Sequence, residues 1–201
     1  MRWLTLYLRS RRAPMALAAA GGLAVLMWSL WSVFSNTRDV GFQMVVLTVL
    51  LLVVALTATL GGPDDALEGT AAMRWPRRRV AHLLVAMLVV VGLVLVTLAS
   101  GARFGPGWMV VRDAAGLLGL TALAAATMGT ARAWFLPLAW TLAAALYPSS
   151  ELVLGQVLTW QAQPPASTAA NVMGALLALS GLVAYAVAGP ARRPPAEAGQ
   201  H

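Results

Sequence analysis

Six long apolar runs, separated by short polar connections, make up most of the chain. A helix that crosses a bilayer needs about 20 residues, so such runs predict membrane-spanning helices. We therefore predict an all-α integral membrane protein with six transmembrane helices, at residues 14–34, 40–60, 80–100, 108–129, 132–147 and 170–189. These form a single transmembrane domain over residues 1–189, and the Pro- and Ala-rich residues 190–201 are expected to be a disordered cytoplasmic tail.

The fourth and fifth runs are less regular than the others. The fourth opens with a charged pair, Arg112 and Asp113, and the fifth is short and contains Pro137. Such segments are tolerated in a membrane where neighbouring protein satisfies the freed backbone groups, so we expect both inside the bundle. Small residues four positions apart predict close helix packing, above all in the fourth run. These pairs are Ala18–Gly22, Ala115–Gly119, Ala122–Ala126 and Gly174–Ala178.

Two short helices are expected outside the spans. Residues 1–13 mix large apolar side chains with four arginines, which is typical of a helix that lies in the membrane interface. Between the fifth and sixth runs, Glu151–Trp160 predicts a short amphipathic helix at the outer surface, ended by Pro164 and Pro165.

The composition limits the classes of function that this chain can have. The chain is 60% hydrophobic and 10% charged, whereas soluble domains carry about 25% charged residues. The runs and their connections leave no room for a soluble enzymatic domain, and no Ser/His/Asp set or paired intramembrane carboxylates occur, so we expect no enzyme. The absence of cysteine excludes thiolate metal sites.

The net charge of +7 comes entirely from arginines, and these flank the apolar runs. We interpret them as membrane anchors rather than as a nucleic-acid surface. With a cytoplasmic N-terminus, three arginines would be outside (Arg38, Arg103 and Arg112) and eleven inside. This bias predicts a multi-pass protein of the cell (plasma) membrane with both termini cytoplasmic. Abundant Ala, Val, Gly and Arg, without Lys, is typical of a GC-rich bacterium.

The longest connection, Gly61–Arg79, is expected on the cytoplasmic side. Pro63 suits the first position of a helix, and acidic residues follow it in the first turns, where the helix dipole favours them. Pro76 is expected to break any helix before the third span begins. The pattern predicts a short helix over Pro63–Met73, and two interpretations stay open: a coupling helix that contacts a partner, or an ordinary capped loop.

The layout resembles the membrane subunits of ABC transporters of the small six-span export type, a group that includes drug and antibiotic exporters. The resemblance rests on RWLTLYLRSRR before the first run, PDDALEGTAAM followed by RWPRRR between the second and third, and SELVLGQVLTW between the fifth and sixth. It implies a permease subunit that works with a cytoplasmic ABC ATPase subunit and a second membrane subunit, in a homodimer or heterodimer within the lipid bilayer. ATP and Mg would bind to the partner ATPase, with no cofactor in this chain.

The same resemblance suggests which residues act. The ATPase-coupling helix would present Asp64, Asp65, Leu67, Glu68 and Met73. Arg132, at the start of the fifth run, would be a second coupling element or only a membrane anchor. The alternative function is a non-transporting accessory or scaffold subunit of a membrane complex.

Polar residues within or beside the runs carry further hypotheses. Arg112 and Asp113 would line a substrate pathway or form an outer gate, or else reach water at the interface. Asn171 and Tyr185 would hydrogen-bond within a pathway or between helices. We expect His82 to bind neither haem nor metal, because the chain has no other histidine within a run and no cysteine.

Overall fold

The computed structural model describes residues 12–61, 75–147 and 152–191, and these residues are mainly helical. Three short 3₁₀ turns accompany the helices: η1 (Thr97–Ala99), η2 (Thr130–Arg132) and η3 (Trp160–Ala162). No β-strand occurs in the described ranges, so the predicted all-α class is confirmed. The α-helices are, in order, α2 (Ala13–Phe34), α3 (Phe42–Thr57), α5 (Trp75–Val96), α6 (Gly107–Met128), α7 (Phe135–Leu146), α8 (Val153–Leu158) and α9 (Thr168–Ala188).

Four helices are long and apolar enough to cross a membrane: α2, α5 with its η1 extension, α6 and α9. They contain 21 to 25 residues, which suits a hydrocarbon layer about 30 Å thick. The other two runs form shorter helices, with 16 residues in α3 and 12 in α7. At the rise of an α-helix these extend only about 24 Å and about 18 Å. The helices indicate a membrane protein with four candidate spans, and the count of six stays a prediction.

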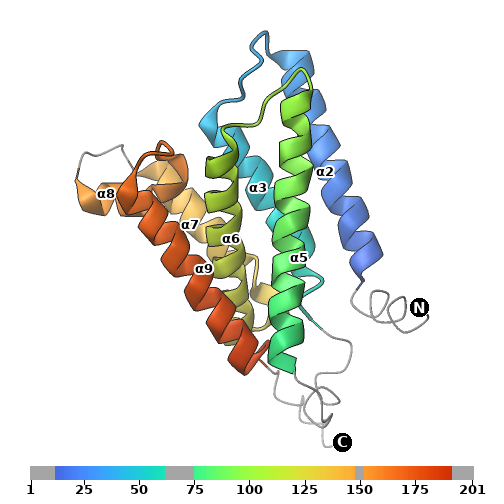
Figure 1. The fold of residues 1–201 in the computed structure, drawn as a ribbon, viewed down its shortest axis with the longest axis vertical. Coiled ribbons are helices and arrows are strands. Elements are labelled where there is room, and N and C mark those ends of the chain that lie inside the picture. The colour runs from blue at the N-terminus through green and yellow to red at the C-terminus, as the bar shows by residue number, and fades with distance from the viewer. Residues whose placement is uncertain (1–11, 62–74, 148–151, 192–201) are drawn as a thin grey trace, which may run out of the picture.

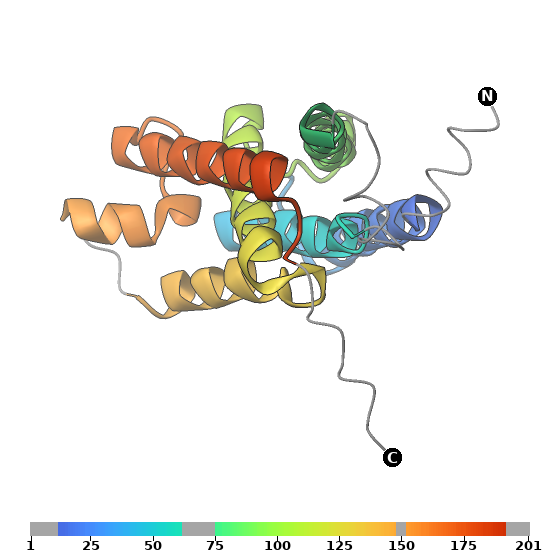
Figure 2. The same ribbon diagram turned by 90° about the horizontal axis from the view of Figure 1, so that it is seen from below.

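The long helices α2, α5, α6 and α9 extend along the molecule, and those that follow one another in the chain run in opposite directions where a short link joins them, as α5 and α6 do (Figure 1). At one end the links 35–41 and 100–106 meet: the Arg103 amide donates to the Arg38 carbonyl (2.7 Å), and the Val40 amide donates to the Arg103 carbonyl (2.9 Å). At the other end α3 and α9 finish and α5 begins, as the view from below shows (Figure 2). We call the first end outer and the second inner, following the predicted topology.

Helix α6 lies at the centre, and 14 of its 22 residues are buried. Helix α9 crosses it at very short range. A Cβ atom on Gly119 would overlap the Leu177 carbonyl, and one on Gly181 would overlap the Gly119 backbone. Small residues therefore bring these two helices together, as predicted for the fourth run. In α2, by contrast, no atom of the described ranges would lie within 4 Å of a Cβ on Gly22.

The third run becomes helical earlier than predicted. Among the described residues, helix α5 begins at Trp75, five residues before the predicted start of the third span, and it includes Pro76. The helix that Pro76 was predicted to end falls in 62–74, outside the described residues.

The prediction that the fifth run packs inside the bundle is wrong. Pro137 is the one buried residue of α7, and Leu142 and Leu146 are 55% and 86% exposed. The proline is the third residue of the helix, where a missing amide proton leaves no acceptor unpaired. Helix α7 thus needs no neighbour to repair its backbone, and its apolar face is left outside the bundle.

The predicted short helix between the fifth and sixth runs is present as α8, inside the predicted range Glu151–Trp160. Most of the N-terminal interfacial helix, the Pro63–Met73 helix and nearly all of the 190–201 tail lie outside the described residues.

Candidate functional site

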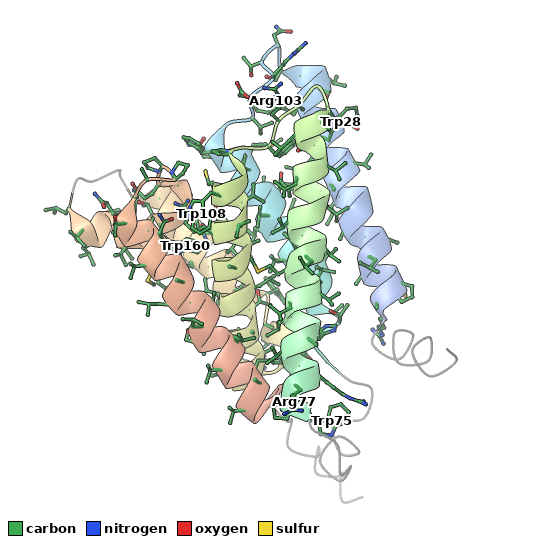
Figure 3. All side chains as sticks on the ribbon, viewed as in Figure 1. Trp28, Trp75, Arg77, Arg103, Trp108 and Trp160 are labelled. Carbon is green, nitrogen blue, oxygen red and sulfur yellow. The ribbon has the colours of Figure 1, made fainter. Side chains whose placement is uncertain are left out.

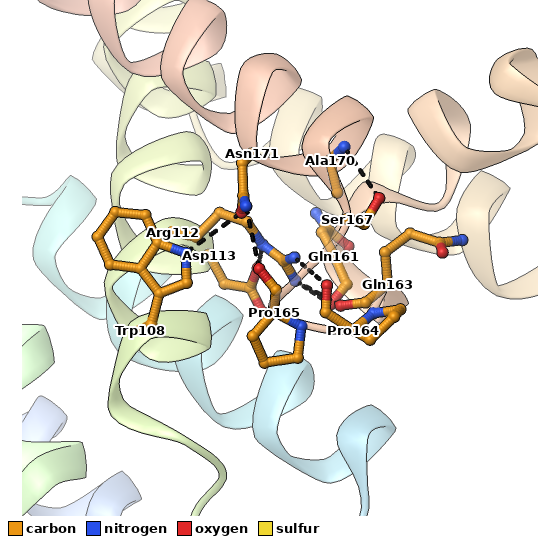
Figure 4. A network of polar contacts seen from close by, with 10 residues as sticks. All are labelled: Trp108, Arg112, Asp113, Gln161, Gln163, Pro164, Pro165, Ser167, Ala170 and Asn171. Atoms are coloured by element: carbon orange, nitrogen blue, oxygen red, sulfur yellow. Dashed lines mark hydrogen bonds and ion pairs between the residues drawn. The ribbon is translucent and has the colours of Figure 1, made fainter.

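The charged pair of the fourth run lies in the second turn of α6, facing the segment between α8 and α9. Arg112 Nε donates to Asp113 Oδ1 at 3.0 Å. The two other guanidinium nitrogens donate to backbone carbonyls, Nη2 to Gln161 (3.2 Å) and Gln163 (3.0 Å), and Nη1 to Pro164 (3.4 Å) (Figure 4). We call these five residues the Arg112 latch, because they join α6 to the segment that leads into α9.

The sequence explains why carbonyl groups gather there. Gln163 precedes Pro164 and has φ −76° and ψ 147°, the extended conformation that a following proline imposes. Pro164 and Pro165 lack amide protons, so they offer acceptors only. The Pro165 carbonyl accepts from Asn171 Nδ2 at 3.0 Å, and Ser167 Oγ caps α9 by accepting from the Ala170 amide at 3.3 Å. The segment is thus held against the first turn of α9.

Burying the two charges of the Arg112 latch costs free energy. The side chains of Arg112 and Asp113 are 2% and 0% exposed, so the interpretation in which the pair reaches water does not describe this structure. Removing two charges from water costs several kcal/mol per ion, which is offset only when further hydrogen bonds complete the site. The planar guanidinium serves several acceptors at once. Asp113 Oδ2, in contrast, is buried and has no hydrogen-bond partner among the described residues.

Trp160 fills the space beside the Arg112 latch. Its indole is fully buried and packs between two helices that both have glycine at the contact. A Cβ on Gly116 of α6 would overlap the indole ring, and one on Gly174 of α9 would lie 3.5 Å from it and 3.0 Å from Arg112 Cγ. The indole fixes the 160–165 segment from its apolar side, while Arg112 fixes it from its polar side.

A second group of contacts lies at the inner end, beside the connection between α3 and α5. Tyr185 of α9 is buried, and its hydroxyl donates to the Leu60 carbonyl at 2.6 Å. Arg79 of α5 donates from Nη1 to the Ala186 carbonyl at 3.3 Å. We call these two hydrogen bonds the stem contacts, because they tie both ends of the 62–74 connection to α9. Tyr185 therefore connects α9 to the residues that follow α3.

His82 and Asn171 also make hydrogen bonds between elements. His82 Nε2 lies 2.9 Å from Thr59 Oγ1, which links α5 to the end of α3. Asn171 Oδ1 accepts from Trp108 Nε1 at 3.3 Å, which links α9 to the first turn of α6. Trp108 and Trp28 belong to the outer half of the molecule, and Trp75 lies at its inner end (Figure 3).

The structure brings together only some of the predicted site residues. Arg112 and Asp113 are adjacent and buried, and Arg132 is exposed at the last position of η2, between α6 and α7. The expected ATPase-coupling residues all lie outside the described residues: Asp64, Asp65, Leu67, Glu68 and Met73.

Sequence reasoning missed Trp160 and the carbonyls of Gln161 and Gln163 as partners of Arg112. A weak signal was present in Gly116 and Gly174, because glycine lowers helix stability and small residues in apolar runs often mark close packing. The signal is not specific, since Gly22 in the first run lies in open space. A backbone acceptor, however, has no residue type that identifies it.

Comparison with protein families, characterised proteins and solved structures finds no match to this chain.

Proposed function

We propose that the chain is the permease subunit of an ATP-driven ABC exporter, with six crossings and a separate ATPase subunit. Two lines support the proposal: the resemblance in layout, and a mechanical connection through the molecule. The observation that carries it is that one helix pair, α6 and α9, joins the stem contacts at the inner end to the Arg112 latch at the outer end.

The proposed mechanism begins at the 62–74 connection. A partner that moves this connection pulls on its two stems, Leu60 and Arg79, both of which are hydrogen-bonded to α9. Since α9 and α6 are in backbone contact at Gly119 and Gly181, they move together as a unit. Packed elements of this kind transmit small displacements by rigid-body motion.

The outer end of the same unit holds the Arg112 latch. In this proposal the 160–165 segment leaves the α6–α9 unit, which separates Arg112 from the carbonyls of Gln161, Gln163 and Pro164 and also breaks the Asn171–Pro165 hydrogen bond. In this proposal the latched state is outwardly closed, and ATP-driven movement at the inner end changes which side is open. Arg112 and Asp113 act as an outer gate, and the substrate is left open.

The coupling role is tested by a charge reversal in the 62–74 connection. Glu68→Arg places a cation where the proposal has an acidic contact with the ATPase. We expect the reconstituted complex to hydrolyse ATP more slowly while the variant still inserts into membranes. The matched control is Glu197→Arg, the same charge change in the C-terminal tail. Unchanged hydrolysis with Glu68→Arg, or an equal loss with both variants, would contradict the coupling role.

A further inference from the structure

An apolar groove opens between α5, α6 and α9, near the middle of these helices. It encloses about 150 Å³, and an apolar space of that size holds a benzene-sized hydrocarbon. Its floor consists of the small residues Ala115, Gly119 and Ala178, and its walls consist of larger side chains: Leu83, Leu84, Met87, Leu118, Leu179 and Leu182. In a bilayer such a groove must be filled by hydrocarbon, because an empty space forfeits the contacts of its lining atoms.

Arginines stand at the inner end of the groove. In α5, Arg77 lies seven residues before Leu84, and Arg79 lies four residues before Leu83. Spacings of four and seven keep side chains on the same side of a helix, so both arginines lie below the groove walls. Arg79 also bonds to the Ala186 carbonyl of α9, while Arg77 is exposed, at the lower end of α5 (Figure 3).

The neighbouring Arg78 faces elsewhere. Spacings of four and seven relate it to His82 and Val85, which do not line the groove. Its guanidinium carbon lies 5.8 Å from the centre of the Trp75 ring. Arg77 and Arg78 are therefore adjacent and carry the same charge, but only Arg77 lies on the groove side of α5. Arg78 is thus a matched control for Arg77.

We propose that this groove is a binding site for an anionic phospholipid of the leaflet at the inner end, with one acyl chain between α5 and α9 and the phosphate beside Arg77. A cationic side chain at the headgroup level attracts anionic lipid, and the apolar groove directly above it receives the chain. The site depends on the membrane location of α5, α6 and α9 and not on the transport function.

The test uses the full chain, reconstituted in phosphatidylcholine nanodiscs that contain a small fraction of a photoactivatable lipid. The probe is phosphatidylglycerol with a diazirine in one acyl chain, and the comparison probe is phosphatidylcholine with the same chains. We expect phosphatidylglycerol to label Leu84, Met87 and Leu179 several-fold more than phosphatidylcholine does. Equal labelling of these residues by the two probes, or labelling confined to other residues, would overturn the proposal.

Variants separate the two halves of the site. Arg77→Gln should lower labelling by phosphatidylglycerol roughly five-fold, whereas Arg78→Gln should leave it unchanged. Ala178→Leu fills the floor of the groove and should abolish labelling at Met87 without changing any charge. Equal losses with Arg77→Gln and Arg78→Gln would show general attraction to a basic surface and would overturn the specific site. The comparison of the two probes on the unmodified chain holds even if a variant does not fold.

Discussion

Arg112 is the residue on which the outer half of the molecule depends most. The residue as a whole is 4% exposed, and its guanidinium group donates hydrogen bonds to Asp113 and to three backbone carbonyls. A buried pair of this kind contributes little net stability compared with apolar side chains of the same size, but the loss of one member leaves the other charged and unpaired. A role in fixing α6 against the 160–165 segment therefore explains the buried Arg112–Asp113 pair better than added stability does.

The first prediction concerns this pair. Arg112→Leu should lower the free energy of unfolding in detergent by about 3–5 kcal/mol, because it leaves the Asp113 carboxylate buried without its partner. Replacing both with leucine should destabilise the protein less than the sum of the two single changes. Thermal unfolding followed by intrinsic tryptophan fluorescence measures each value. Additive losses would show that the two side chains are not coupled.

The second prediction concerns the indole beside the pair. Gly116→Ala places a methyl group in the ring of Trp160, so it should destabilise the protein by about 1–3 kcal/mol through overpacking. Gly22→Ala, in open space on α2, is the matched control and should cause no loss. The same thermal unfolding measurement compares them, and equal behaviour of the two variants would contradict the packing at Gly116.

At the scale of the helices, the apolar periodicity predicted most elements but not which of them are central. Six runs became six helices, and Glu151–Trp160 contains α8. Burial was predicted correctly for α6 and incorrectly for α7, because Pro137 was treated as an interruption although it lies in the first turn. Arg112 and Asp113 stood out as charges in an apolar run, whereas their backbone partners are set by the tertiary path of the 160–165 segment and have no sequence signal.

The stem contacts make a prediction at this scale. Tyr185→Phe removes the hydrogen bond to the Leu60 carbonyl while keeping the ring in its buried place. The loss should destabilise the protein by about 0.5–1.5 kcal/mol, the net contribution of a typical hydrogen bond. It should also speed proteolytic cleavage between α3 and α5, since one stem is released. Cleavage at an unchanged rate would show that the contact does not hold the stem.

At the scale of the whole molecule, the central question is how many helices cross the membrane. Helices α3 and α7, with 16 and 12 residues, are shorter than a full span, although the sequence predicts that both cross the membrane. The chain contains no cysteine, so a single introduced cysteine reports the side of the membrane without background.

Three exposed positions decide the count: Thr37 before α3, Ala131 before α7 and Ala162 after α8. With six crossings and a cytoplasmic N-terminus, a membrane-impermeant maleimide added to intact cells should label Thr37→Cys and Ala162→Cys and should not label Ala131→Cys. Labelling after lysis is the control for accessibility. If Ala131→Cys and Ala162→Cys behave alike, α7 does not cross, and if Thr37→Cys and Ala131→Cys behave alike, α3 does not cross.

The permease proposal is tested most directly by isolating the chain with its partners. The tagged full-length protein is purified from its native membranes in a mild detergent, and the bound proteins are identified by mass spectrometry. The proposal predicts a stoichiometric subunit with a phosphate-binding P-loop. Purification from membranes that contain such an ATPase, without any ATPase bound, would contradict the proposal and favour an accessory membrane subunit.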